Sequence, residues 1–238
     1  MIRCPTCGRR IAVAAPRCPI HGAPPPAPPP PADAGTPYVV PTPDLPGFRV
    51  IKTLGQGGFG AVFLAERAPA GEHVAIKVAR ADNASASEAL LREADALFTV
   101  GAPHVPAVYA RGRLDDGAAY LVLEFVRAPV LADRLTELPG AMDMEEVGRH
   151  AMAILAVVEA AHARDLVHCD LKPENVFIDP AFGAKLFDFG LVRKVGALAP
   201  RAEATKEEAP AGTPEYMSPE QCEGRTDVSA RRDRKSVV

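Results

Sequence analysis

The sequence predicts an α+β protein in which a strand-rich part with one helix precedes a mainly helical part. Short β-rich runs, separated by glycine or Pro-Ala-Gly turns, occupy residues 48–54, 61–66, 73–79 and 118–126. Apolar residues at helical spacing cover residues 85–98 and, over a longer stretch, residues 143–163. We see no internal repeat, so this order describes the whole chain after its first segments.

The composition is that of an ordinary globular protein. The chain has 238 residues, of which 47% are hydrophobic and 24% charged, and its length suits one domain plus accessory segments. The net charge is 27 − 30 = −3, which argues against a nucleic-acid partner. No apolar run approaches the roughly 20 residues that cross a bilayer, and the N-terminus lacks a secretory signal. We therefore expect no membrane segment in this chain and a cytoplasmic location.

Residues 1–22 contain a candidate structural zinc site. Two half-sites, C-x₂-C and C-x₂-H, provide four ligands: Cys4, Cys7, Cys18 and His21. Thiolates and imidazole at these spacings are typical of a zinc ribbon or knuckle with a closed tetrahedral Zn²⁺. The alternative is a cysteine-containing tail that binds no metal. The odd cysteine count argues against a disulfide framework.

Residues 23–46 form a proline-rich stretch. Dense prolines cannot donate hydrogen bonds to a helix or a sheet, so this segment is predicted to be an extended linker. A docking site of the PxxP type is a weaker alternative.

The glycine-rich stretch "LGQGGFGAV" lies between two predicted strands. Glycines let a backbone bend tightly and approach phosphates, but a dinucleotide-binding fold would require the motif to open a helix. Since "AVFLAE" continues as a strand, we predict a glycine-rich hairpin that covers phosphates. Downstream, "VAIK" ends at Lys77, which would be costly to bury unless it were paired.

A partner for Lys77 can be predicted from helix periodicity. In the helix over residues 85–98, Glu93 falls on the same face as Leu90, Ala94 and Leu97. We therefore expect Glu93 to pair with Lys77, whereas the alternative is a solvated helix charge. Ser85 and Glu88 have capping-box spacing at the start of this helix. The helix over residues 143–163 is expected to have Asp143 and Glu146 in its first turn. Its apolar face is expected to contain Val147, Ala151, Ile154, Val158 and Ala161.

The stretch "LVHCDLKPENVFID" places His168, Asp170, Lys172 and Asn175 within eight positions. With "GQGGFGAV", "VAIK", "DFG" at 188–190 and "GTPEYMSPE", it resembles the protein-kinase family in motif order and spacing, from about residue 48 onward. The D-L-K-P-E-N and GTPEY forms resemble the serine/threonine branch, of bacterial type. The resemblance implies a two-lobed kinase fold with a five-stranded antiparallel sheet and one helix in the N-lobe and hinge (47–126), and a helical C-lobe (127–238).

The resemblance also implies an ATP-dependent protein serine/threonine kinase with ATP, Mg²⁺ and protein substrates. It gives Asp170 as proton acceptor, with Lys172, Asn175 and Thr213 beside it, and Asn175 and Asp188 as Mg²⁺ ligands. The implied ATP-binding residues are Leu54, Gly55, Gln56, Gly57, Gly58, Phe59, Gly60, Ala61, Val62, Ala75, Lys77, Glu93, Leu123, Glu124, Val126 and Phe177. For the apolar members of this set, plain core packing is an equally good local explanation.

Cys169 stands where most relatives have an arginine that pairs with a phosphate on the activation segment. A thiol cannot form that pair, so we expect activity that does not depend on phosphorylation, for example of Thr205, through this residue. The alternative is that Cys169 is a small side chain that fills the space.

The resemblance ends early in the C-lobe, where Asp233 and Ser236 resemble the opening of the helix that supports the catalytic loop. We therefore expect a C-lobe that is incomplete after the activation segment. A truncated, non-catalytic kinase-like binding or scaffold protein is the main alternative function. A function set by the zinc module ranks last.

Overall fold

The computed structural model describes residues 2–3, 10–11, 39–138, 140–179, 183–194, 213–222 and 233. The chain divides into two compact units, Met1–Val39 and Val40–Val238. In the first unit, β1 (Ile2–Arg3) pairs antiparallel with β2 (Arg10–Ile11). The four predicted zinc ligands, Cys4, Cys7, Cys18 and His21, lie outside the described residues.

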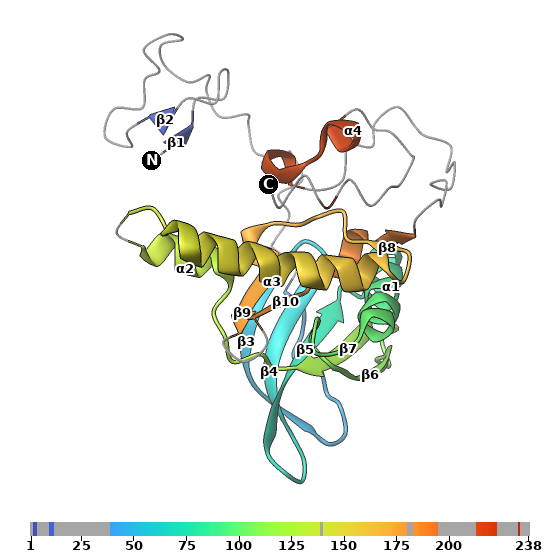
Figure 1. Cartoon of the computed structure of the whole chain (residues 1–238). Coiled ribbons are helices and arrows are strands. Elements are labelled where there is room, and N and C mark those ends of the chain that lie inside the picture. Colours follow the sequence, from blue (N-terminus) through green and yellow to red (C-terminus); the bar gives the residue numbers. More distant parts are fainter. Residues whose placement is uncertain are drawn as a thin grey trace. The chain divides into compact units, whose positions relative to one another are not determined.

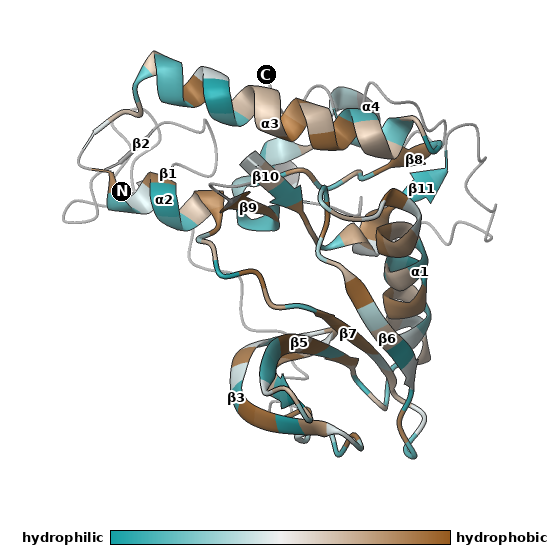
Figure 2. Cartoon of the chain, turned by 60° about the horizontal axis from the view of Figure 1, so that its bottom comes forward, coloured by the Kyte–Doolittle hydropathy of each residue, from teal (hydrophilic) through white to brown (hydrophobic). Residues whose placement is uncertain are grey.

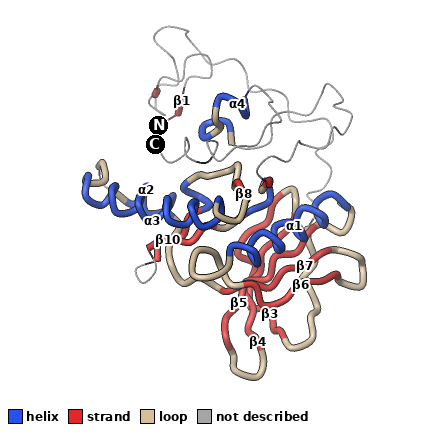
Figure 3. The backbone as a smooth tube through the Cα atoms, turned by 45° about the vertical axis from the view of Figure 1, so that its right-hand side comes forward, coloured by secondary structure: helices blue, strands red, loops and turns tan. Residues whose placement is uncertain are grey.

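The second unit contains a five-stranded antiparallel sheet with the strand order β3-β4-β5-β7-β6 (Figure 3). Its strands are β3 (Phe48–Gly57), β4 (Gly60–Arg67), β5 (Glu72–Ala79), β6 (Val108–Arg113) and β7 (Ala119–Glu124). Hydrophobic residues concentrate on β5 and β7 (Figure 2), where Val74, Ile76, Leu121 and Val122 have no exposed surface. The predicted five-stranded sheet is therefore confirmed.

Helix α1 (Ala84–Val100) is the one helix described between the strands of this sheet, as predicted. The expected cap was wrong: Asn83, not Ser85, is the N-cap, and its side chain accepts a hydrogen bond from the backbone N–H of Ala86. An asparagine one residue before the helix satisfies a free N–H of the first turn, so the helix begins two residues earlier than the capping-box pattern indicated.

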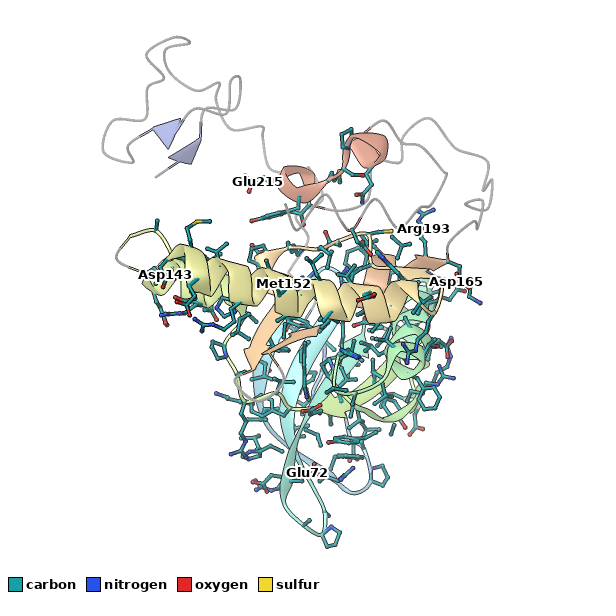
Figure 4. All side chains as sticks on the ribbon, viewed as in Figure 1. Glu72, Asp143, Met152, Asp165, Arg193 and Glu215 are labelled. Atoms are coloured by element: carbon teal, nitrogen blue, oxygen red, sulfur yellow. The ribbon has the colours of Figure 1, made fainter. Side chains whose placement is uncertain are left out.

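Helix α3 (Met144–His162) begins as predicted, because the Asp143 side chain accepts from the backbone N–H of Glu146. Figure 4 shows Asp143 at one end of this helix and Asp165 just beyond the other. The expected apolar face was partly wrong: Val147 is 39% exposed, whereas Val157 is buried beside Ile154, Val158 and Ala161. Helix α2 (Leu131–Glu137), which precedes α3, was not predicted.

The helical part also contains short strands and turns that carry the polar motifs. The antiparallel pairs are β8 (Leu166–Val167) with β11 (Arg193–Lys194) and β9 (Val176–Asp179) with β10 (Gly183–Leu186). The remaining helical turns are η1 (Pro173–Asn175), η2 (Phe189–Leu191), η3 (Pro214–Tyr216) and α4 (Pro219–Cys222). In Figure 1, α3 lies across the β9–β10 hairpin, and it packs on β10.

One buried cluster joins the sheet to the helical part. It contains Leu97 of α1, Leu121 of β7, Val158 of α3, Leu186 of β10 and Phe189 of η2. Because the elements that carry the polar motifs end in this shared core, their side chains are held in fixed relation to one another. Val40 and Leu45, at the end of the proline-rich stretch, are also buried.

Among the described residues, no helix has both the length and the apolar character needed to span a membrane.

Candidate active site

The glycine-rich motif forms the turn between β3 and β4, with Gly57 paired to Gly60 across the hairpin. The prediction of a hairpin rather than a helix opening is therefore confirmed. Gly60 requires glycine, because a Cβ there would overlap the carbonyl oxygen of Val78 on β5. A Cβ at Gly55, Gly57 or Gly58 would meet no atom within 4 Å, so these positions leave open space around the hairpin. Phe59, at the turn, is 77% exposed.

Lys77 on β5 is held between two carboxylates. Its Nζ lies 2.9 Å and 2.7 Å from the two oxygens of Glu93 on α1, and 3.0 Å from Oδ1 of Asp188. The Glu93 side chain is only 4% exposed, and Lys77 is 29% exposed. The ion pair that helix periodicity predicted is therefore present, and a second one joins Lys77 to the segment before η2.

The pKa values of Lys77, Glu93 and Asp188 depend on one another. Burial alone would lower the pKa of Lys77, but the carboxylates of Glu93 and Asp188 outweigh burial and raise it above the usual lysine value. Burial would raise the pKa of Asp188, but Lys77 holds it below the usual carboxyl range. Burial raises the pKa of Glu93, and the Lys77 ammonium opposes that rise. A lysine beside two carboxylates stays protonated and carries a fixed positive charge at neutral pH.

Asp170 lies in a loop of polar groups that hold both of its carboxylate oxygens. Oδ1 accepts hydrogen bonds from the backbone N–H of Thr213 at 3.1 Å and from its hydroxyl at 3.2 Å. Oδ2 pairs with Nζ of Lys172 at 2.9 Å and accepts from Nδ2 of Asn175 at 3.3 Å. Lys172 also donates to the Thr213 hydroxyl at 2.9 Å. The structure therefore brings all four predicted catalytic residues together.

His168 supports this loop from within the core. The ring is 1% exposed and packs edge-on against Phe189, with the ring centroids 4.5 Å apart. Nδ1 accepts from the backbone N–H of Asp170 at 3.3 Å, so Nε2 carries the proton and donates to the carbonyl of Phe187 at 3.1 Å. The ring thus ties Asp170 to the residue that precedes Asp188.

Two further side chains fix the backbone just before Asp170. The Asp233 carboxylate accepts from the N–H groups of His168 and Cys169, at 2.8 Å and 2.9 Å, and contacts Nε2 of His162 at 2.8 Å. Gln221 Nε2 donates to the carbonyl of Cys169 at 2.7 Å. The sequence pointed to Asp233, but nothing in the pattern indicated His162 or Gln221, because both contacts span long stretches of chain.

Cys169 has a positive φ of 66°, which only a minority of non-glycine residues adopt. Its side chain is buried, packs with Val167 and Leu191, and directs Sγ towards the carbonyl of Val167 at 3.5 Å. These contacts fit the interpretation of a small residue that fills space. Thr205 lies outside the described residues, so the expectation about phosphorylation stays a prediction.

The predicted adenine-binding residues lie on β3, β4, β5, the end of β7 and the residues after it, and β9. Ala75 pairs with Leu123 across the sheet, and Val62 pairs with Lys77. Leu123 and Val126 are buried, whereas Leu54 is 43% exposed. Phe177 of β9 stacks on Phe187 at 4.3 Å, beside the strand that leads to Asp188.

The predicted metal ligands provide hard oxygen donors of the kind Mg²⁺ prefers. Asn175 is 4% exposed, and its Nδ2 donates to the Asp170 carbonyl at 2.9 Å, which leaves the amide oxygen as its ligating atom. Asp188 has a positive φ of 62° and is joined to Asn175 through the hydrogen bond from the Phe187 N–H to the Asn175 carbonyl at 3.1 Å. A carboxylate and an amide oxygen, on segments joined by this backbone hydrogen bond, are donor types that suit a magnesium ion bound to phosphates. In the described part of the chain, including this site, no group of three or more His, Cys, Asp or Glu side chains is placed to hold a metal ion.

Comparison with known proteins agrees with this geometry. The family model for the protein kinase domain matches residues 48–236. The chain is 39% identical over 192 residues to serine/threonine-protein kinase pkn2 of Myxococcus xanthus, an alignment that covers 78% of this chain and 22% of that protein. It is 34% identical over 194 residues to Pkn1 of the same organism, covering 78% and 27%. It is 30% identical over 180 residues to serine/threonine-protein kinase PrkC of Bacillus subtilis, covering 74% and 27%.

The chain spans less than a third of the length of each of these three relatives. The matched region begins with β3 and contains the glycine hairpin, the Lys77 cluster and the Asp170 loop. On the family match and the two-part fold together, the chain belongs to the protein kinase domain family.

Proposed function

We propose that the chain is an ATP-dependent protein serine/threonine kinase, which transfers the γ-phosphate of ATP to Ser/Thr hydroxyl groups of proteins. The observation that carries the proposal is the set of contacts around Asp170, where Lys172, Asn175 and Thr213 together hold one carboxylate. The similar proteins of Myxococcus xanthus and Bacillus subtilis, which are named serine/threonine-protein kinases, support the same assignment.

In this proposal Asp170 accepts the proton of the substrate hydroxyl. The hydroxyl O–H bond breaks, the oxygen forms a bond to the γ-phosphorus, and the bond from that phosphorus to the β-phosphate oxygen breaks, so that ADP leaves. Thr213 and Asn175 hold the two carboxylate oxygens in place, which fixes the direction from which the hydroxyl approaches.

Lys172 and Lys77 supply positive charge at two positions. Lys172 pairs with Asp170 and therefore lies where charge develops on the transferred phosphoryl group. Lys77 is oriented by Glu93, so it can exchange its contact with Asp188 for the phosphates of ATP. Asn175 and Asp188 would hold Mg²⁺, which would offset the negative charge of the phosphates.

The adenine ring would contact the backbone of the hinge, Glu124 to Val126, with Leu123 as the gatekeeper. Leu54, Val62 and Ala75 would lie on one side of the ring and Phe177 on the other, while Gly55–Val62 of the hairpin would cover the phosphates. The open space around Gly55, Gly57 and Gly58 supports this assignment.

The test is transfer of label from γ-³²P-ATP to a generic basic protein, followed by identification of the labelled amino acid. Wild type should label serine or threonine in a magnesium-dependent reaction, and Asp170→Ala should lose about a hundredfold or more in rate. Equal labelling by both proteins would overturn the catalytic assignment and favour a non-catalytic, kinase-like binding protein.

We also propose that residues 1–22 bind a structural zinc ion through Cys4, Cys7, Cys18 and His21 and that residues 23–46 link this segment to the kinase domain. The ligand spacing supports the proposal. Purified protein prepared without chelator should contain one equivalent of zinc, and Cys4→Ser/Cys7→Ser should lose it. Zinc near zero in the wild type would refute the site.

A further inference from the structure

Lys185 on β10 is a buried lysine that the proposed chemistry does not use. Its side chain is 3% exposed, and its Nζ lies 2.6 Å from Oε1 of Glu124. Glu124 is the last residue of β7 and the first residue of the proposed hinge. Lys185 is three positions before Asp188, on the strand that leads to the proposed metal ligand. The pair therefore connects the hinge, which would bind adenine, to β10, the strand that leads to the carboxylate that would bind Mg²⁺.

Stability alone does not account for this pair. A buried ion pair is often no more stabilising than apolar side chains of the same volume, because both charges lose their hydration. Lys185 is almost completely buried and lies opposite the aromatic Phe177 in the β9–β10 pair, so an apolar side chain could also be buried at this position. A charged pair at this place fixes a distance between two elements, which apolar packing specifies less strictly.

The hydrogen bonds around this pair make two separate connections, one from Ala107 to Glu124 and one from Lys185 to Glu124. The hinge end is held by Ala107, whose carbonyl accepts from the Glu124 N–H at 2.8 Å and whose N–H donates to Glu124 Oε2 at 3.1 Å. These bonds do not involve Lys185. Lys185 adds the connection from Glu124 to β10, next to the bond from the Leu186 N–H to the carbonyl of His104 at 3.0 Å.

Beyond the hinge, the chain is attached to β9, because the Ile178 N–H donates to the carbonyl of Pro129 at 3.0 Å. The β9–β10 hairpin therefore holds the hinge at two places. Lys185 holds its first residue, Glu124, and Ile178 holds the chain just after it, at Pro129. The same hairpin connects Asn175 to Phe187 and hence to Asp188.

We infer that Lys185 is a positioning residue, which holds the hinge and the Asp188 strand at a fixed separation through Glu124. A ligand that contacts only the hinge does not depend on this separation, whereas ATP with magnesium spans it. The inference rests on the proposed function, since it takes ATP as the ligand that bridges the two elements.

The experiment compares two ligands on the same variants by titration calorimetry: adenosine without metal, and ATP with magnesium. Lys185→Met removes the ammonium group and keeps an unbranched apolar side chain. Glu124 stays 27% exposed and keeps its bond from Ala107, so its carboxylate is not left without a partner. Lys194→Met makes the same chemical change at an exposed lysine on β11 and serves as the control.

For Lys185→Met we expect the affinity for ATP with magnesium to fall by about tenfold and the affinity for adenosine to stay unchanged. A merely structural role would lower the fraction of binding-competent protein for both ligands and leave the ratio of the two affinities unchanged. That result, or unchanged binding of both ligands, would overturn the inference. Lys194→Met should match the wild type with both ligands.

A second set of variants tests whether the two residues act as one link and covers the case in which Lys185→Met does not fold. Glu124→Gln and Lys185→Gln each keep a hydrogen-bonding group and remove one charge. The double variant should weaken binding of ATP with magnesium no more than the more harmful single variant does, and additive losses would contradict a shared link. If wild type binds ATP but transfers no phosphate, the proposed function fails while this inference is still decided by the binding data. If wild type does not bind ATP with magnesium, both fail.

Discussion

Replacing Asp233 with alanine should destabilise the protein and the loop that carries Asp170. The Asp233 carboxylate is 1% exposed and accepts from two backbone N–H groups, those of His168 and Cys169, and contacts His162. Removing it leaves those two N–H groups buried without an acceptor. At about 1–3 kcal/mol for each unsatisfied group, the free energy of unfolding should fall by about 2–6 kcal/mol. Because Asp170 follows directly after these residues, the rate of phosphoryl transfer should fall as well.

The assay is urea denaturation followed by circular dichroism, with phosphoryl transfer measured on the same samples. Asp233→Asn keeps one acceptor oxygen but places an NH₂ group where the second oxygen was, so its loss should be smaller than that of alanine. Asp115→Ala, at an exposed aspartate in a turn, is the matched control and should unfold like the wild type. If Asp233→Ala unfolds at the same urea concentration as the wild type, the carboxylate does not hold the loop and the reasoning is refuted.

Further predictions concern the nucleotide-binding part of the site. Glu93→Gln removes the charge that orients Lys77, so kcat/KM for ATP should fall by about a hundredfold, and an unchanged value would refute the orienting role. Gly60→Ala should destabilise the protein by about 1–3 kcal/mol because its Cβ would overlap the Val78 carbonyl, whereas Gly58→Ala, which meets open space, should unfold like the wild type. The raised pKa of Lys77 means that its contribution to stability is complete below the unfolded lysine pKa of about 10.4 and is lost as the pH rises through the higher folded value. The stability difference between wild type and Lys77→Met, measured by urea denaturation, should therefore begin to shrink once the pH exceeds the unfolded pKa of about 10.4. A difference that stays constant above this pH would contradict the pairing.

The sequence predicted the parts of the fold that depend on local pattern. Short β-rich runs located β3, β4, β5 and β7, and helical spacing placed Glu93 on the buried face of α1, where it meets Lys77. The glycine spacing and the strand that follows it identified the hairpin. Local pattern suffices for β4, β5, β7 and α1 because each of them buries apolar side chains. β3 has no buried residue and was located by its β-rich composition and the glycine turn that follows it.

Features that depend on competition between neighbours or on distant contacts were missed. The cap was predicted at Ser85 from its spacing to Glu88, but the side chain of Asn83, two positions earlier, accepts from the Ala86 N–H instead. The seven-residue α2 has no fully buried residue, and its two leucines, Leu131 and Leu135, form too short an apolar stripe to predict it. The Lys185–Glu124 pair spans 61 residues, and the contacts from His162 and Gln221 are also long-range, so no spacing rule within one element indicates them.

The central claim is that Asp170 accepts the proton during transfer of phosphate from ATP to a protein hydroxyl. The most direct measurement is the single-turnover rate of phosphoryl transfer for wild type and Asp170→Ala, with affinity for ATP and magnesium determined on the same preparations. We predict unchanged nucleotide affinity and a rate lower by about a hundredfold or more in the variant. Equal rates at equal affinity would contradict the assignment of Asp170 and, with it, the proposed reaction.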